Sequence, residues 1–337
     1  MIAVDIWQGL ADVPADLGPT VVTIGVFDGV HRGHRKLIET AVTRAHQLGL
    51  PCVLMTFDPH PLAVVAPAKM PPMLGAVSSR AELAEQLGVD HILAVKFTPD
   101  LAGLSPEDFF ERVLLQTLHA RAIAVGENFT FGHKAAGTTE TLRGLGERSG
   151  VEVDVVPLLE DEGVTLSSTY IRGRLAEGDV ERAGWALGRP YSVAATVERG
   201  AGRGGRELGY PTANMYFPES TMLPADGVYA GWFTILEPAS AKRGEQTGEA
   251  SAGAVNTMRP GTRYPAAISV GTNPTFGDAK RSVESYVLDE ESDLYGARCQ
   301  VDFVGHVRQM ETFHGVDELL KAMAGDVRRT KEILGVS

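Results

Sequence analysis

The stretch G-V-F-D-G-V-H-R-G-H, Gly25 to His34, decides how the first half of this 337-residue chain folds. The apolar run 21–24 precedes it, and residues 35–48 follow it with apolar side chains at helical spacing. This order predicts a strand, a glycine-rich turn and a helix. His31 and His34 then lie where the helix begins, and the free backbone N–H groups there suit a phosphate. A Walker A loop is excluded, because the chain contains no Gly-Lys pair.

Composition narrows the class of protein. With 44% hydrophobic and 22% charged residues, the chain can build globular cores. The formal charge of −12 argues against a basic face, so we expect no nucleic-acid partner. Two cysteines, Cys52 and Cys299, are too few for a disulfide framework and lie in apolar runs, which predicts buried thiols. No leader segment or membrane-spanning run is evident, so we expect no membrane partner and a cytoplasmic protein.

Residues 1–186 alternate between strand-like and helix-like segments. Such alternation predicts a Rossmann-like α/β domain, in which helices cover a parallel sheet. Ligands of such sheets bind at the carboxyl ends of strands, and the Gly25–His34 stretch follows such an end. The predicted strands are 21–26, 52–57, 91–95, 123–125 and 151–156, and the predicted helices are 35–48, 79–87 and one that begins at Ser105.

Residues 187–337 show a different sequence pattern, with short β-rich runs in place of the alternating strands and helices. Short β-rich runs separated by Gly, Pro and Asn turns predict an antiparallel β-barrel or sandwich. Segment 237–265 predicts a long connection, and a terminal helix follows the last run. The β-rich runs are 193–197, 228–235, 266–270, 282–288 and 299–304, and the apolar stripe of the helix is Val316, Leu319, Leu320, Met323, Val327 and Ile333.

Three interpretations of the histidine pair stay open. His31 and His34 bind a metal ion together with Asp28, or they are structural, or their imidazoles hydrogen-bond a phosphate. The preceding strand and the three glycines of the stretch favour the phosphate.

The run L-S-S-T-Y-I-R, residues 166–172, predicts another helix start. Capping by Ser167 or Ser168 explains this run by itself. The same hydroxyl and N–H groups, with Thr169 and Arg172, equally form an anion site.

A glycine-bounded loop follows the predicted strand 123–125. Its Asn128 and Phe129 suit hydrogen bonding and stacking on a planar ring. Packing of the loop itself is the alternative.

The run G-A-G-R-G-G, residues 200–205, formally matches the G-x-G-x-x-G pattern. No amphipathic helix follows, so a dinucleotide-binding site is excluded. Gly200, Gly202 and Gly204 form either a flap over phosphates or a plain glycine turn.

Three further residues in the β-rich half are candidates for metal binding or catalysis. Thr212 and Asn214 are two residues apart, so in an extended segment they share a face, and their neutral oxygens suit Mg²⁺ that also binds ATP. Glu284 lies on an alternating run, on the same face as Tyr286 and Leu288, and is a candidate base. The alternatives are a structural turn for the first pair and a solvated edge-strand acid for Glu284.

Together these motifs resemble those of the bacterial bifunctional riboflavin kinase/FMN adenylyltransferases, also called prokaryotic FAD synthetases. The first motif is similar to the H-x-G-H signature of nucleotidyltransferases. Eight motifs in the family's order span nearly the whole chain, and actinobacterial members are the nearest resemblance. The motifs are G-V-F-D-G-V-H-R-G-H, T-F-D-P-H-P, G-E-N-F-T-F-G, S-S-T-Y-I-R, G-Y-P-T-A-N, G-V-Y-A-G, S-V-G-T-N-P-T-F-G and V-E-S-Y-V-L-D.

For residues 1–186 the resemblance implies an FMN adenylyltransferase domain. The FMN phosphate attacks the α-phosphorus of ATP, which gives FAD and pyrophosphate. His31 and His34 would stabilise charge on the phosphates, and Asn128 and Phe129 would hold the flavin. The implied ATP- and phosphate-binding residues are Gly25, Phe27, Ser168, Thr169 and Arg172.

For residues 187–337 the resemblance implies a riboflavin kinase barrel. Glu284 would take the proton of the ribityl 5′-hydroxyl, which attacks the γ-phosphorus of ATP. Thr212 and Asn214 would hold Mg²⁺, and Gly200, Gly202 and Gly204 would belong to a flap over the phosphates. The expected partners are riboflavin, FMN and ATP, in a monomer or weak homo-oligomer.

One position departs from the family pattern, because Thr165 stands where a close relative has Arg. Two other functions are alternatives. Transfer of a nucleotide to another phosphate ester rests on the histidine pair alone, and the β-rich half argues against it. A flavin-binding or regulatory module without catalysis conflicts with five intact residues, namely Glu284, Thr212, Asn214, His31 and His34.

Overall fold

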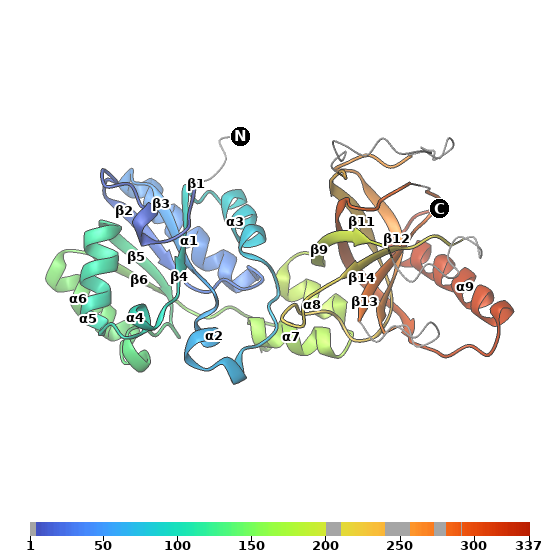
Figure 1. Cartoon of the computed structure of the whole chain (residues 1–337). Helices are drawn as coiled ribbons and strands as arrows, with labels where there is room; N and C mark the ends of the chain where they lie inside the picture. Colours follow the sequence, from blue (N-terminus) through green and yellow to red (C-terminus); the bar gives the residue numbers. More distant parts are fainter. Residues whose placement is uncertain (1–4, 200–209, 240–256, 273–280, 291) are drawn as a thin grey trace. The chain divides into compact units, whose positions relative to one another are not determined.

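The computed structural model describes residues 5–199, 210–239, 257–272, 281–290 and 292–337. The chain divides into two compact units, Met1–Ser168 and Thr169–Ser337 (Figure 1). Each unit is built around its own β-sheet, as the change from alternating strands and helices to short β-rich runs in the sequence predicts.

A six-stranded parallel sheet forms the N-terminal unit, with strand order β1-β4-β3-β2-β5-β6. Helices cover both faces, so the central strands read as continuous apolar runs rather than alternating ones. A small antiparallel hairpin, β7–β8, follows the sheet. The strands are β1 (Asp5–Trp7), β2 (Thr20–Ile24), β3 (Cys52–Asp58), β4 (His91–Lys96), β5 (Ala120–Gly126), β6 (Glu152–Val156), β7 (Glu160–Asp161) and β8 (Val164–Thr165).

Two apolar cores lie on the two faces of this sheet. Helices α1 and α3 close one core, and α5, η3 and α6 close the other. The apolar side chains of α1 are buried, as their helical spacing predicts, except for the last one. Leu48 is 39% exposed and lies beside the end of the helix at Gly49. The helices are η1 (Leu10–Asp12), α1 (Arg32–Leu48), α2 (Pro61–Val65), η2 (Pro67–Lys69), α3 (Val77–Gln86), α4 (Pro99–Ala102), α5 (Pro106–Phe109), η3 (Phe110–Thr117), η4 (His133–Ala135) and α6 (Thr139–Ser149).

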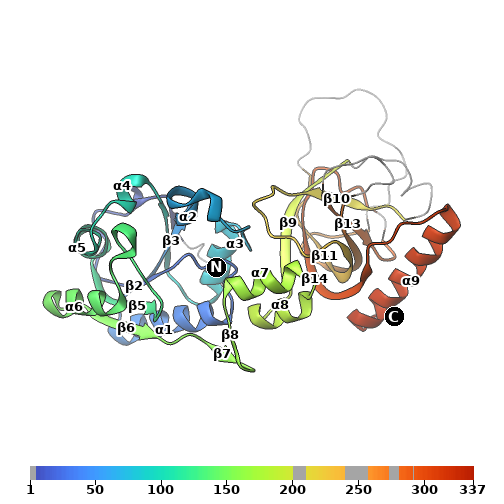
Figure 2. The ribbon, with the colours of Figure 1, turned by 90° about the horizontal axis from the view of Figure 1, so that it is seen from below.

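The second unit is a closed antiparallel barrel with strand order β10-β13-β12-β11-β14-β9, which confirms the predicted barrel. Helix α9 lies against the outside of the barrel (Figure 1, Figure 2). Its elements are α7 (Ser168–Ala176), α8 (Val180–Leu187), β9 (Tyr191–Glu198), β10 (Ala213–Tyr216), β11 (Gly227–Glu237), β12 (Arg263–Gly271), β13 (Ser282–Val287), β14 (Arg298–Gln309) and α9 (Val316–Leu334).

Helices α7 and α8 connect the parallel sheet to the barrel and pack with the barrel. The N–H of Ala225 donates to the carbonyl of Leu175 in α7 at 2.8 Å. The compact units therefore divide before these helices, and the domain boundary between residues 186 and 187 stays a prediction.

The predicted apolar stripe of α9 is half-buried except at Val316, which is 55% exposed. The buried side chains of the helix are polar, namely Asp326 and Thr330. Nε and Nη2 of Arg308 in β14 donate to the two carboxylate oxygens of Asp326 at 2.7 and 2.8 Å. A two-point charged hydrogen bond thus anchors the helix, which hydrophobic spacing alone does not reveal.

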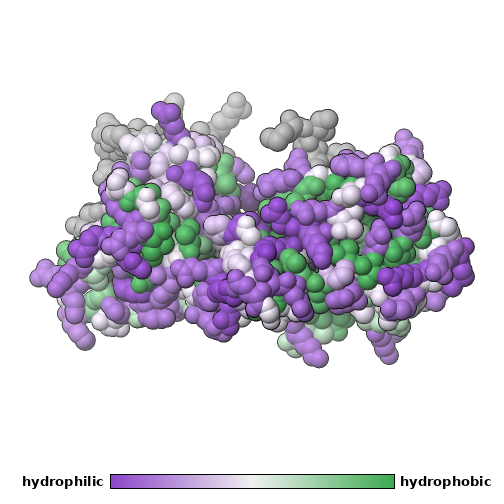
Figure 3. All heavy atoms as spheres, turned by 180° about the vertical axis from the view of Figure 1, so that it is seen from behind, coloured by the Kyte–Doolittle hydropathy of each residue, from purple (hydrophilic) through white to green (hydrophobic). Residues whose placement is uncertain are grey.

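The two thiols are buried, as the sequence predicts, and hydrophilic side chains are common on the surface. Cys52 and Cys299 are buried and free, and burial raises the pKa of each thiol to about 12. Hydrophilic side chains are interspersed with apolar patches on the face shown in Figure 3. Within the described ranges, every helix is too short or too polar to cross a bilayer.

Replacing Asp326 with Ala is expected to lower the free energy of unfolding of the barrel unit by about 3 kcal/mol, because the Arg308 guanidinium would lose its two-point partner in a packed site. Urea titration monitored by circular dichroism measures this change. As a control, Glu332→Ala removes the partner of Arg329 in an exposed pair and is expected to cost less than about 1 kcal/mol. Equal losses in the two variants would contradict the anchoring role.

Candidate active sites

The turn between β2 and α1 holds an unusual backbone. Phe27 and Val30 have φ angles of 51° and 39°, which are uncommon for side chains larger than glycine, and both side chains are buried. The N–H of Val30 donates to the carbonyl of Phe27 at 3.1 Å. A Cβ at Gly25 would lie 3.1 Å from the Phe27 ring, so the absence of a side chain at Gly25 leaves room for that ring. We name residues 25–31 the phosphate turn.

His31 and His34 meet at the start of α1. The backbone N–H of His34 donates to Nδ1 of His31 at 3.3 Å, so His31 caps the helix. The two rings stack with centroids 3.7 Å apart and an interplanar angle of 22°. Because Nδ1 of His31 accepts a hydrogen bond, the proton of the neutral ring sits on Nε2, which is then a donor.

His34 is held in its neutral form. Burial lowers the pKa of His34 well below 6.5, and the nearby charges of His31 and Arg80 lower it further. Its Nδ1 is buried and has no hydrogen-bond partner in the described part of the chain. The ring edge also contacts Phe27, with centroids 5.3 Å apart. His34 is therefore a neutral imidazole at pH 7.

Asp28 supports the turn rather than completing a metal site. Its carboxylate oxygens accept from the N–H of Leu74 at 3.0 and 3.1 Å, and its side chain is 2% exposed. Among the described residues, no three His, Cys, Asp or Glu side chains are grouped to hold a metal ion. Of the three interpretations of the histidines, the metal site with Asp28 has no support in this geometry.

The β7–β8 hairpin brings Ser168 to the phosphate turn. Oγ of Ser168 donates to the carbonyl of Asp28 at 2.8 Å, and an ion pair of 2.8 Å joins Arg32 to Asp161 in β7. Thr169 and Arg172 follow in α7, which belongs mainly to the second unit. Their place at the phosphate stays a prediction.

The aromatic loop after β5 packs on the core through its phenylalanines, and its predicted binding of a planar ring stays a prediction. Asn128 is exposed, whereas Phe129 is half-buried, packs on the core and stacks on Phe131 with centroids 5.6 Å apart. Phe129 thus has the packing role that was the alternative. Strand β5 pairs with β2, so Asn128 and the phosphate turn follow neighbouring strand ends.

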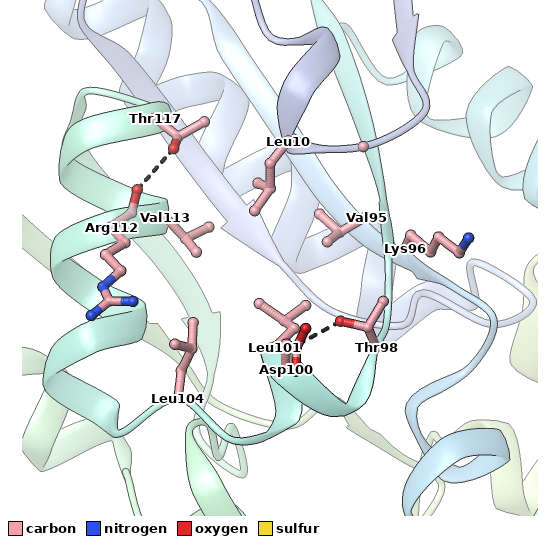
Figure 4. Close-up of a pocket in the computed structure, with 11 residues that line it drawn as sticks. Leu10, Val95, Lys96, Thr98, Asp100, Leu101, Leu104, Arg112, Val113 and Thr117 are labelled. Carbon is pink, nitrogen blue, oxygen red and sulfur yellow. Dashed lines mark hydrogen bonds between the residues drawn. The ribbon is translucent and has the colours of Figure 1, made fainter.

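A cavity of about 350 Å³ lies on the opposite face of the sheet from α1 (Figure 4). Neither Asn128 nor Phe129 lines it. The charged ends of Lys96 and Arg112 point outward, and the π-helical segment η3 forms one wall. The lining comes from several separate segments, so no local motif could indicate it; its apolar members are Leu10, Val95, Leu101, Leu104 and Val113.

In the barrel, strand register places three predicted residues together. Asn214 of β10 is directly opposite Glu284 of β13, so their side chains share a face. Nδ2 of Asn214 donates to the carbonyl oxygen of Thr212 at 3.2 Å and is 3.4 Å from its Oγ1. The predicted alternation around Glu284 is also present, since Val283 and Ser285 are fully buried whereas Glu284 is half-buried.

These oxygens fit a hard cation such as Mg²⁺. The amide nitrogen of Asn214 is hydrogen-bonded to Thr212, so its Oδ1 and the Thr212 hydroxyl are oxygens of the kind that such a cation binds. The carboxylate of Glu284 accepts from Oγ of Ser282 at 3.2 Å and lies on the same face. Gly200, Gly202 and Gly204 lie outside the described residues.

Comparison with known proteins decides which family combines these two sites. A family model described as FAD synthetase matches residues 13–170, and one described as riboflavin kinase matches residues 187–334. The bifunctional riboflavin kinase/FMN adenylyltransferase of Escherichia coli strain K12 is 30% identical over 318 residues, covering 94% of this chain and 93% of the relative. This chain belongs to that family.

Other members of the bifunctional riboflavin kinase/FMN adenylyltransferase family agree. The Bacillus subtilis enzyme is 33% identical over 312 residues, covering 91% of this chain and 90% of the relative. A crystal structure described as a macrolide-efflux protein from Streptococcus pneumoniae is 30% identical, with a TM-score of 0.80 over 98% of this chain and 99% of that one. The family resemblance of the motifs is confirmed, and the closeness to actinobacterial members stays a prediction.

The free energy of unfolding of the N-terminal unit is expected to fall as the pH drops through 6.5. The folded-state pKa of His34 lies below that ordinary value, so the unfolded chain binds the proton first. The stability is complete above pH 6.5 and is lost towards the lower folded pKa. Urea titrations at several pH values should show a weaker slope in His34→Asn.

The control for this titration is His46→Asn, at the exposed far end of the same helix. It is expected to keep the slope of the unmodified protein. An unchanged slope in His34→Asn would show that burial of His34 does not govern the acid response.

Proposed function

We propose that this chain phosphorylates riboflavin to FMN and then adenylylates FMN to FAD, using ATP in both reactions. The observation that carries the proposal is the pairing of each family match with a suitable site. The stacked histidines lie within the FAD synthetase match, and Glu284 opposite Asn214 lies within the riboflavin kinase match.

In the adenylyltransferase reaction, a phosphate oxygen of FMN attacks the α-phosphorus of ATP, and pyrophosphate leaves. Nε2–H of His31 and the neutral ring of His34 hydrogen-bond the phosphate oxygens as charge develops, beside the N-terminus of α1. Binding of the nucleotide and its phosphates is assigned to Gly25, Phe27, Ser168, Thr169 and Arg172, and binding of the flavin to Asn128 and Phe129.

In the kinase reaction, Glu284 removes the proton of the ribityl 5′-hydroxyl. The resulting oxygen attacks the γ-phosphorus of ATP, and ADP leaves. Thr212 and Asn214 hold Mg²⁺, which when bound neutralises charge on the ATP phosphates. Gly200, Gly202 and Gly204 cover the phosphates as part of a flap.

Three further expectations accompany this function. Riboflavin, FMN and ATP are the partners, with no nucleic acid and no membrane. A monomer or weak homo-oligomer and a cytoplasmic location remain predictions from the sequence.

Glu284→Gln is expected to lower riboflavin phosphorylation at least about 100-fold, because the amide cannot accept the hydroxyl proton. Conversion of added FMN to FAD should remain. Chromatography of the flavins after incubation with ATP and Mg²⁺ separates the two reactions.

His31→Ala is the reciprocal variant. It removes a phosphate donor, so FAD formation from FMN should fall about 100-fold or more while FMN formation continues. Loss of both activities in either folded variant would contradict the assignment of two separate sites.

Asn214→Ala is expected to raise the Mg²⁺ concentration needed for half-maximal riboflavin phosphorylation about tenfold, because one oxygen ligand is removed. Met215→Leu, on the buried face of the same strand, is the matched control and should leave this value unchanged. An unaltered Mg²⁺ dependence in Asn214→Ala would remove Asn214 from the metal site.

A further inference from the structure

A buried arginine lies behind the phosphate turn, and no motif of the sequence pointed to it. Arg80 of α3 is only 5% exposed. Its Nη1 donates to the carbonyl of Val26 at 2.8 Å and to Oγ1 of Thr56 at 3.0 Å. The Thr56 hydroxyl donates to the same carbonyl at 3.0 Å. Arg80 therefore ties the exit of β2 to the neighbouring strand β3, one residue before the strained Phe27.

The charge of Arg80 lacks a direct counterion. A buried guanidinium is costly unless a carboxylate pairs with it. Across the described ranges, no carboxylate lies within ion-pair distance of Arg80, and its Nε has no hydrogen-bond partner. Asp28 and Asp58 act on it only through space, and the Asp28 carboxylate is bonded to the N–H of Leu74. Carboxylates beyond ion-pair distance thus offset this buried charge only in part, and an anion near the turn would stabilise it further.

The charge of Arg80 also lowers the pKa of His34. The groups that face His34 are His31 on its own helix, Arg80 from α3 and the ring of Phe27 in the turn. Burial is the largest cause of its lowered pKa, and the positive charges of His31 and Arg80 add to it. Arg80 is thus linked to the histidine pair through the backbone of the turn and through its electric field.

We propose that Arg80 is a positioning residue of FMN adenylylation, which holds the phosphate turn in place and sets a fixed positive charge behind the histidine pair. The charge favours an anionic polyphosphate at the pair, and the two hydrogen bonds keep the turn that presents it. The proposal rests on the proposed role of His31 and His34 in that reaction.

Three variants separate the charge from the hydrogen bonds. Arg80→Met keeps most of the side-chain volume and removes the charge, Arg80→Lys keeps the charge but not the fork of donors, and Thr56→Val removes only the shared hydroxyl. The measurements on the full chain are the NMR titration of His34, kcat and KM for ATP in FMN adenylylation, and riboflavin phosphorylation as a control for folding.

In Arg80→Met the pKa of His34 is expected to rise relative to the unmodified protein, and KM for ATP to rise about tenfold. Arg80→Lys should restore the His34 titration and much of the ATP affinity, but with a reduced kcat. Thr56→Val should leave the titration unchanged. Riboflavin phosphorylation should be unaltered in all three.

Two results would overturn the proposal. One is a folded Arg80→Met protein with the His34 titration and ATP kinetics of the unmodified chain. The other is equal loss of both activities in Arg80→Met and Arg80→Lys, which marks a purely structural arginine. Failure of the proposed histidine role looks different, because His34→Asn would then retain adenylylation while Arg80→Met still shifts the His34 titration.

Discussion

The hydrogen bond from the His34 backbone N–H to Nδ1 of His31 is the contact on which the N-terminal site depends. It caps α1, fixes the proton of the neutral His31 ring on Nε2 and accompanies the stacking of the two rings. The turn that leads to it contains two non-glycine residues with positive φ, Phe27 and Val30, so local propensity does not maintain it. Two tertiary hydrogen bonds hold the turn instead. Thr56 in β3 and Arg80 in α3 both donate to the carbonyl of Val26, which follows β2. The chemistry at the helix start is thus supported from the sheet edge.

In the barrel, strand register rather than side-chain contacts positions the candidate residues. Asn214 and Glu284 face each other because of the register between β10 and β13, and a slip of one residue would turn Glu284 to the buried face. Closure of the barrel opposes such a slip, because every strand is paired on both sides. Backbone pairing therefore places the proposed base beside the proposed metal ligands, whereas side-chain contacts position the histidines.

The sequence predicted what local periodicity encodes and missed what tertiary packing adds. The strand, turn and helix around residues 21–48 were predictable, because apolar runs and glycines mark them. The exposure of Leu48 and Val316 was not, since spacing fixes a helix face but not where the facing surface ends. The cavity lining and Arg80 gave no signal either. A charged residue in a helical pattern reads as solvated, and only the fold shows that Arg80 is buried beneath Val26.

The acidity of the chain explains why this arginine matters. A protein of net charge −12 repels polyphosphates, so the proposed phosphate site needs local positive potential. Imidazolium rings cannot supply it here. Protonated Nδ1 of His31 could no longer accept the capping hydrogen bond, and two like charges would stack 3.7 Å apart. The site must therefore work with neutral imidazoles as donors. A fixed charge then has to come from a group that stays protonated when buried, and a guanidinium meets that requirement better than an amine.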